Sequence, residues 1–179
     1  QKLPQKYLPY VTLFGRALLE MGTEKEDYVK LSQHIGRTTG GIVPASLALM
    51  KSGGQGSFVR LFLRGKAVTS QVEELLDILK DVLLTARLDN PERFKQIVLE
   101  EKVNQEAGVI PAGHSVTNLR LRALFNEADW ANEQMDGPSY LFFLRGEVRI
   151  QFLQNLLPRL FNINVQILEN ARGHAIAFT

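Results

Sequence analysis

Apolar residues recur every three or four positions at the start of the chain, which is the spacing of one helix face. The first helix follows Pro9, a residue suited to a first helical turn. Its apolar positions are Val11, Phe14, Leu18 and Met21. A second helix is expected to begin in a capping box at residues 23–26 (TEKE) and to end at Gly40 and Gly41. Its inner face would hold Tyr28, Leu31 and Ile35.

From Ile42 onward the apolar period changes to two, which is the period of a β-strand. In residues 42–50, one row of alternating positions holds Val43, Ala45, Leu47 and Leu49, and the other holds Pro44, Ser46, Ala48 and Met50. In the next run Val59, Leu61 and Leu63 face one way, and Arg60 and Arg64 face the other. Residues 51–57 (KSGGQGS) join the runs as an antiparallel hairpin, and Pro44 favours an edge position for the first strand.

Four further helices are expected downstream. One begins in a capping box at residues 70–73 (SQVE) and carries the stripe Val72, Leu75, Leu76, Leu79, Leu83 and Ala86. The next runs from the N-cap Asn90 to about residue 107, with an inner face of Phe94, Ile97 and Val98. After a break at residues 108–113 (GVIPAG), a third covers residues 114–127, with Val116, Leu119, Ala123 and Leu124 on one face. The last is capped by Ser139 and is kinked or ended by Pro158.

The order of these elements predicts an α+β fold, in which helices pack on one face of an antiparallel sheet. Residues 163–168 fit either a strand or a last helical turn, and residues 175–178 are expected to form a closing strand. We expect residues 1–179 to form a single domain. So few strands cover six helices poorly, so the sheet is expected to be incomplete at an edge. The start at Gln1, without a methionine, predicts a fragment of a longer protein.

Composition changes this picture mainly by exclusion. The hydrophobic content of 45% and the charged content of 22% are ordinary for a globular protein. A net charge of +2 gives no field that would favour nucleic acid or an anionic membrane as a partner. The chain has no cysteine, which excludes disulfides, thiolate nucleophiles and cysteine-type zinc sites. No apolar run approaches the ~20 residues that span a bilayer, so no membrane span is expected.

The residues show no motif for catalysis. Zinc peptidases place two histidines and a glutamate close together on one helix, whereas His34, His114 and His174 stand far apart. We expect them at a helix surface, near a helix start and at a strand end; a metal site built from all three is the disfavoured alternative. No serine stands in a Gly-x-Ser-x-Gly elbow. The glycine clusters at residues 39–41 and 52–57 precede strands, which indicates turns rather than phosphate loops.

Two pairs of charged residues complete the candidate chemistry. Glu100 and Glu101 are neighbours in the sequence and point apart on a helix, so a solvated face is expected for both. Arg120 and Arg122 lie in a mostly apolar segment, residues 119–125 (LRLRALF). At a pocket wall they would bind a carboxylate bidentately. An ion pair within the protein, or plain solvent exposure, is the more common situation for such residues.

Several stretches together carry a resemblance to a known family. They are residues 8–42 (LPYVTLFGRALLEMGTEKEDYVKLSQHIGRTTGGI), residues 108–122 (GVIPAGHSVTNLRLR) and Gly137 before the last long helix. In this order and spacing the chain resembles the presequence protease branch of the pitrilysin/insulinase metallopeptidases, which carry an inverted zinc motif. It is similar to the third of their four domains over nearly its whole length.

The resemblance implies an enzyme of two similar halves that close around a chamber. The zinc motif lies in the first half, and the third domain forms part of the opposite wall. By this resemblance the chain is non-catalytic and holds no catalytic residue, no metal ligand and no cofactor; zinc belongs to the parent enzyme. The implied partners are the remaining domains of the parent peptidase and short unfolded peptides. His114, Arg120 and Arg122 are the candidates for positions that face the substrate chamber.

Two other functions stay open. The same fold occurs in inactive scaffold or core subunits that pair with a catalytic partner, and a zinc motif in the preceding part of the parent would separate the two. A nucleotide-binding module that uses the glycine clusters would bind ATP, which we do not expect. The resemblance also leaves the compartment open: cytoplasmic for a bacterial parent, and mitochondrial or another organelle for a eukaryotic one.

Overall fold

A computed structural model describes residues 4–53 and 56–147 of the chain. The helices are α1 (Tyr10–Glu20), α2 (Tyr28–Thr38), α3 (Val72–Leu84), α4 (Pro91–Val109), α5 (Gly113–Arg122), α6 (Glu127–Asp136) and α7 (Pro138–Glu147), with short 3-10 turns at Gln5–Tyr7 and Thr69–Gln71. The strands are β1 (Ile42–Met50) and β2 (Ser57–Gly65). The predicted closing strand, residues 163–168, the kink at Pro158 and His174 lie outside the described residues.

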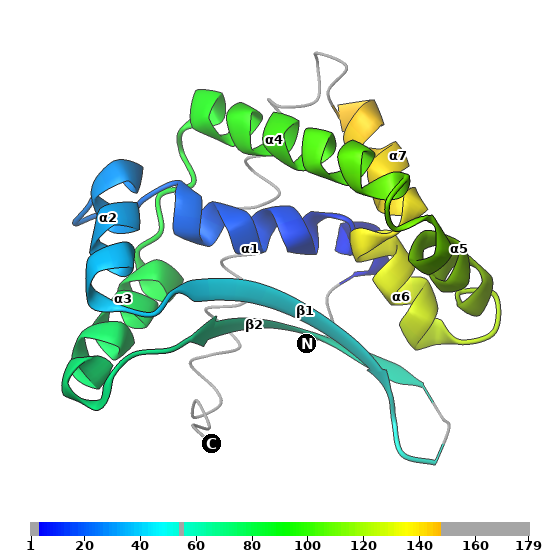
Figure 1. Cartoon of the computed structure of the whole chain (residues 1–179), viewed down its shortest axis with the longest axis horizontal. Coiled ribbons are helices and arrows are strands. Elements are labelled where there is room, and N and C mark those ends of the chain that lie inside the picture. The colour runs from blue at the N-terminus through cyan, green and yellow to red at the C-terminus, as the bar shows by residue number, and fades with distance from the viewer. Residues whose placement is uncertain (1–3, 54–55, 148–179) are drawn as a thin grey trace.

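The two strands form an antiparallel hairpin, and α1 and α6 lie across one of its faces (Figure 1). Helices α4 and α7 form a further layer beyond α1. This arrangement confirms the predicted α+β class, with helices packed on one face of an antiparallel sheet. Within the described residues, no helix is both long and apolar enough to cross a membrane.

The pairing of the hairpin runs from Ile42 opposite Gly65 to Met50 opposite Ser57. The row of β1 that faces the helices is the one with small residues, including Pro44 and the buried Ala48. This row suits α1, which approaches closely: a Cβ added to Gly15 would lie 2.8 Å from the Cβ of Pro44. The other row, which includes Val43 and Leu49, is exposed.

The main core lies between α1, α3, α4 and α7. Its fully buried members include Phe14, Leu18, Val82, Phe94 and Tyr140. A smaller cluster joins the hairpin to the start of the chain and to α6; its members are Leu8, Val11, Ala48, Ala128, Ala131 and Met135. The second cluster fixes α6 against β1, and α6 in turn carries the groups that position α5.

The predicted start of α2 is wrong. The helix begins at Tyr28, and Asp27 caps it, because an Asp27 carboxylate oxygen accepts a hydrogen bond from the backbone N–H of Lys30 at 2.9 Å. The preceding residues form a turn, in which the N–H of Thr23 donates to the carbonyl of Glu26 at 2.8 Å. Tyr28 was expected inside but is exposed, with the guanidinium of Arg93 lying 4.8 Å from its ring centroid.

The second predicted capping box is also wrong, although the helix itself is confirmed. Ser70 lies in a 3-10 turn, and no side chain caps the start of α3. The buried row of α3 is Leu75, Ile78 and Val82. Val72 and Leu76, which the expected stripe included, are each 41% exposed. Helix α3 carries two adjacent apolar rows, and only the row nearer to α1 and α2 is buried.

Helix α4 follows the prediction closely, from its N-cap Asn90 to its buried Phe94, Ile97 and Val98. The expectation that both glutamates of the Glu100–Glu101 pair face solvent is wrong for Glu101, which is buried. One Glu101 oxygen accepts a hydrogen bond from Nη1 of Arg16 at 3.0 Å, and Arg16 also pairs with Glu20 and Glu100. This cluster ties α4 to α1 at a sequence separation that local patterns do not reveal.

The region after α4 differs most from the prediction. A single helix was expected over residues 114–127, but α5 ends at Arg122 and a separate helix, α6, begins at Glu127. No helix was predicted over residues 127–136. Asn126 causes the change of direction, because its Oδ1 accepts a hydrogen bond from the backbone N–H of Asp129 at 2.7 Å. The predicted N-cap Ser139 instead lies inside α7, which begins at Pro138.

Candidate functional site

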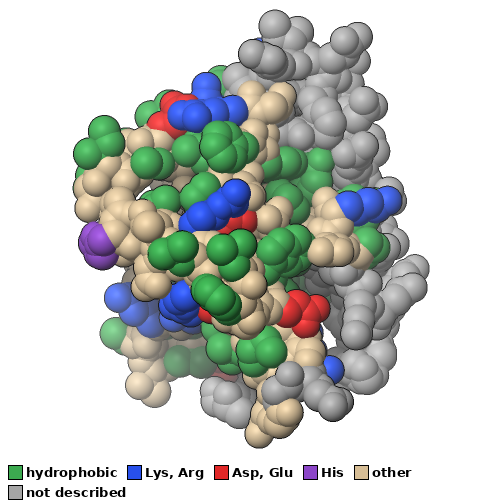
Figure 2. All heavy atoms as spheres, turned by 90° about the vertical axis from the view of Figure 1, so that its right-hand side faces the viewer, with side chains coloured by type: hydrophobic (Ala, Val, Ile, Leu, Met, Phe, Trp, Pro, Cys, Tyr) green, Lys and Arg blue, Asp and Glu red, His purple; other side chains and the backbone are tan. Residues whose placement is uncertain are grey.

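Helix α5 has no buried residue, although it contains Val116, Leu119 and Leu121. We call the surface made by its exposed side chains and by the connection to α6 the α5 face. The α5 face comprises His114, Arg120, Leu121, Arg122, Leu124 and Phe125. Figure 2 shows the side of the molecule on which α5 lies, with hydrophobic side chains interspersed with basic ones.

The apolar part of the α5 face is unusually open to solvent. Leu124 is 75% exposed and Phe125 is 84% exposed, and Leu121 is also exposed. Single exposed apolar residues are normal on a protein surface, but neighbouring ones on one surface indicate an interaction site. This surface is therefore the first candidate for a functional site in the described part of the chain.

Arg120 is held by an acid that lies beneath it. Its Nη1 forms an ion pair with Oε1 of Glu133 and donates to Oγ of Ser139 at 3.1 Å. The Glu133 side chain is 2% exposed, and its Oε1 also accepts a hydrogen bond from the backbone N–H of Ser139 at 3.0 Å. One buried carboxylate of α6 thus orients Arg120 and satisfies the first turn of α7.

Arg122 is held in the same way by Asp129. Its Nε donates to Oδ2 of Asp129 at 3.0 Å, and its Nη2 pairs with Oδ1 in a bidentate arrangement. The hydrogen bond from Asn126 and, after it, the pairing with Arg122 hold the pKa of the Asp129 carboxyl below its usual value, against the opposing effect of desolvation. Asp129 also lies in the first turn of α6, where a negative charge is favourable.

The structure therefore brings the two predicted arginines to one surface, each paired with an acid of α6. His114, the third predicted residue, lies exposed in the first turn of α5, and within the described residues it forms no hydrogen bond or ion pair. Its predicted place near a helix start is confirmed. Sequence reasoning missed the residues that position the arginines, Asp129 and Glu133. The available signal was Asn126 followed by two acids, which is typical of a helix start.

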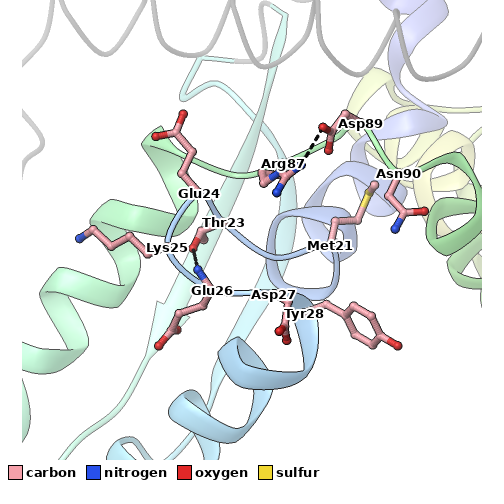
Figure 3. A pocket seen from close by; sticks show the side chains of 10 residues that line it. All are labelled: Met21, Thr23, Glu24, Lys25, Glu26, Asp27, Tyr28, Arg87, Asp89 and Asn90. Carbon is pink, nitrogen blue, oxygen red and sulfur yellow. Dashed lines mark hydrogen bonds and ion pairs between the residues drawn. The ribbon is translucent and has the colours of Figure 1, made fainter.

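A hollow at the other end of α1 is a second candidate (Figure 3). It lies where the turn before α2 meets the connection from α3 to α4, joined by hydrogen bonds from Glu24 N to Thr85 O and from Arg87 N to Gly22 O, both 3.0 Å. The side chains of Glu24, Lys25 and Tyr28 point in different directions in Figure 3 and do not converge. Such a splayed set offers no arrangement of acid, base and nucleophile.

The chemistry of metals and nucleotides finds little support in the described residues. In residues 4–53 and 56–147, no three histidine, aspartate or glutamate side chains gather in a group that could hold a metal ion. The backbone amides of the first glycine cluster are already engaged. The N–H of Gly40 donates to the carbonyl of Lys66 at 2.7 Å, and that of Gly41 donates to Oγ1 of Thr39 at 3.0 Å. These amides are not free to bind a phosphate.

Fold and surface together define an α+β domain that presents a partly apolar face and holds its charged groups in internal pairs. Comparison with known families identifies it further. Residues 1–146 match the family described as associated with the M16 peptidases of subfamily C, and the chain belongs to this family. It is thus an associated domain of presequence-protease-type peptidases, which confirms the resemblance found in the sequence.

Three relatives illustrate the relationship. The chain is 36% identical over 142 residues to Presequence protease 1, chloroplastic/mitochondrial, of Arabidopsis thaliana, which covers 79% of this chain and 13% of that protein. It is 27% identical over 143 residues to Protein HypA of Clostridium perfringens, covering 79% of this chain and 15% of that protein. It is 22% identical over 178 residues to Presequence protease, mitochondrial, of Schizosaccharomyces pombe, covering 99% and 18%. The chain therefore spans less than a fifth of the length of these relatives.

Proposed function

We propose that this chain forms part of the inner wall of a closed peptidase chamber and leaves bond cleavage to other domains of the parent. The observation that carries the proposal is the α5 face, a solvent-exposed apolar surface with arginines fixed at its margin. The relatives that are named presequence proteases supply the context. In this proposal, zinc and the catalytic residues belong to the other domains.

An unfolded peptide suits the α5 face for a physical reason. Such a peptide exposes apolar side chains and unpaired backbone carbonyls, because it has no core and no secondary structure of its own. Leu124 and Phe125 offer apolar contact area to the side chains. Arg120 uses Nη1 for its internal contacts, and in the described structure its Nε and Nη2 donate to no protein group. These N–H groups are available to peptide carbonyls.

Photo-crosslinking in the parent peptidase tests the position of the wall. A photoreactive residue placed at Leu124 or Phe125 should crosslink an unstructured peptide of about 20 residues when the chamber closes. The matched control is Val68, which is also exposed but lies before α3, away from the α5 face. Equal labelling from position 68, or no peptide labelling from positions 124 and 125, would contradict the proposal. Crosslinks to another subunit instead of the peptide would support the scaffold alternative.

The division of labour has its own test on the chain alone. Purified residues 1–179 should bind a short unstructured peptide weakly and should not cleave it, with or without added zinc. Zinc-dependent cleavage by the pure chain would overturn the assignment of catalysis to other domains.

A further inference from the structure

The ring of His34, in the middle of α2, lies between two carboxylates from different parts of the chain. Its Nδ1 is 3.1 Å from both Oε1 and Oε2 of Glu26, which belongs to the turn before α2. Its Nε2 is 2.7 Å from Oε1 of Glu74, in the first turn of α3. We call this arrangement the His34 bridge. It joins the turn, α2 and α3 through one side chain.

The chemistry of the bridge requires a charged ring. An ionised carboxylate only accepts hydrogen bonds, and a neutral imidazole carries a single N–H. Only the imidazolium donates from both nitrogens, so a neutral ring would point a lone pair at one of the two carboxylates. Desolvation opposes the charged form, but the hydrogen bonds to Glu26 and Glu74 outweigh it, and the pKa of His34 lies above its usual value of 6.5.

The surroundings favour the charged ring as well. The hollow beside His34, between α2 and α3, is also lined by the charged residues Lys25, Asp77, Lys80 and Asp81. Lys25 donates to both oxygens of Asp81, at 2.9 and 2.7 Å, and this pair does not titrate near neutral pH. On α2 itself, Lys30 and Arg37 lie one turn before and after the histidine. With Glu26 and Glu74 counted, acids outnumber lysines in the hollow.

Helix α2 depends on this bridge because it has few other anchors. Leu31 is its one buried residue. The backbone after the helix is fixed through Gly40, whose N–H donates to the carbonyl of Lys66 at 2.7 Å. Between these two attachments, the His34 bridge is the side-chain link from α2 to the first turn of α3.

We propose that the His34 bridge is a proton-dependent link, which holds α2 against α3 when the ring is charged and loosens when the ring is neutral. A histidine whose pKa is raised by folding stabilises the folded state fully below its unfolded pKa. That contribution is lost as the pH rises from about 6.5 through the raised folded pKa. The chain should therefore be less firmly closed between α2 and α3 under mildly alkaline conditions.

Nuclear magnetic resonance titration of the histidine rings in residues 1–179 tests the link. The resonance of His34, assigned with His34→Gln, should titrate above 6.5 and above that of the exposed His114. Either Glu26→Gln or Glu74→Gln should lower the pKa of His34 toward 6.5. Amide exchange in α2, corrected for the intrinsic pH effect, should accelerate above the pKa of His34, whereas exchange in the core of α4 should not.

Lys25→Met is the matched control, because it removes an ion pair from the same hollow without removing a group that titrates near neutrality. Its effect on stability should stay constant between pH 6 and pH 9, whereas the effect of His34→Gln should shrink as the pH rises. A His34 pKa at or below 6.5 would overturn the proposal. So would a pKa that Glu74→Gln leaves unchanged; that variant keeps the ring and provides the test if His34→Gln fails to fold.

Discussion

Glu133 offers the sharpest test of how the α5 face is held in place. Its buried carboxylate accepts from Arg120, from the backbone N–H of Ser139 at 3.0 Å and from Nε2 of Gln134 at 2.8 Å. The carboxylate is buried, whereas the Arg120 side chain is 56% exposed. The two partners of this ion pair should therefore differ greatly in what their removal costs.

The expected costs follow from this asymmetry. Glu133→Ala leaves the buried N–H of Ser139 without an acceptor, which costs about 1–3 kcal/mol, and also removes a hydrogen bond to a charged group. We expect a loss of about 3 kcal/mol in the free energy of unfolding. Glu133→Gln keeps an acceptor oxygen and should cost about 1–2 kcal/mol. Arg120→Ala removes a largely exposed partner but leaves the buried carboxylate with its two neutral donors, so its cost should be nearer 1 kcal/mol.

Urea unfolding of residues 1–179 measures these differences, with the fluorescence of Trp130 as the probe. Trp130 is the one tryptophan of the chain and lies on α6, beside the affected residues. With a slope near 2 kcal/mol per molar urea, Glu133→Ala should lower the midpoint by about 1–2 M. Glu127→Gln, an exposed acid on the same helix, is the control and should cost less than about 1 kcal/mol. Equal losses for Glu133→Ala and Arg120→Ala would refute this reasoning.

Two further changes probe the packing of α1 and the start of α6. Gly15→Ala should destabilise the chain by about 1–3 kcal/mol, since the new Cβ would lie 2.8 Å from the Cβ of Pro44; Gly36→Ala, in open space on α2, should be neutral or stabilising by thermal melting, and the opposite ranking would contradict the close approach. Asn126→Ala should cost about 1 kcal/mol as a lost N-cap. Because the pKa of Asp129 lies below its usual 3.8, its contribution to stability is present above pH 3.8 and lost as the pH falls. The variant should therefore lose less stability than the parent chain on acidification from pH 5 to pH 3, measured by urea midpoints at each pH; an equal loss would exclude this role of Asn126.

Local pattern predicted the elements whose signals are local. The hairpin and α4 fall where the periodicity indicated, because alternation and the cap at Asn90 are properties of neighbouring residues. The starts of α2 and α3 were wrong because a capping box is only one way to begin a helix. At Thr23, the tertiary structure uses the backbone to form a bridge with Ala86 instead.

The failures around the candidate site have a different cause. Arg120 and Arg122 were identified from their apolar surroundings, but their partners lie on a helix that was not predicted. The burial of Glu101 likewise depends on Arg16, 85 positions away in the sequence. A sequence pattern shows which residues are unusual, whereas the identity of a partner across the fold is set by packing that one sequence does not display.

The pairing of the arginines also changes what the α5 face can recognise. From the sequence, Arg120 and Arg122 were candidates to bind a carboxylate. A carboxylate bound to Arg120 through Nη1 would have to displace Glu133, and a displaced Glu133 would remain buried without its countercharge, at a cost of several kcal/mol. A neutral carbonyl needs only the N–H groups that Arg120 leaves unused. The α5 face should therefore distinguish peptides by their apolar side chains and accessible backbone rather than by acidic residues, so replacing acidic residues in the peptide should change its crosslinking at Phe125 less than replacing aromatic ones.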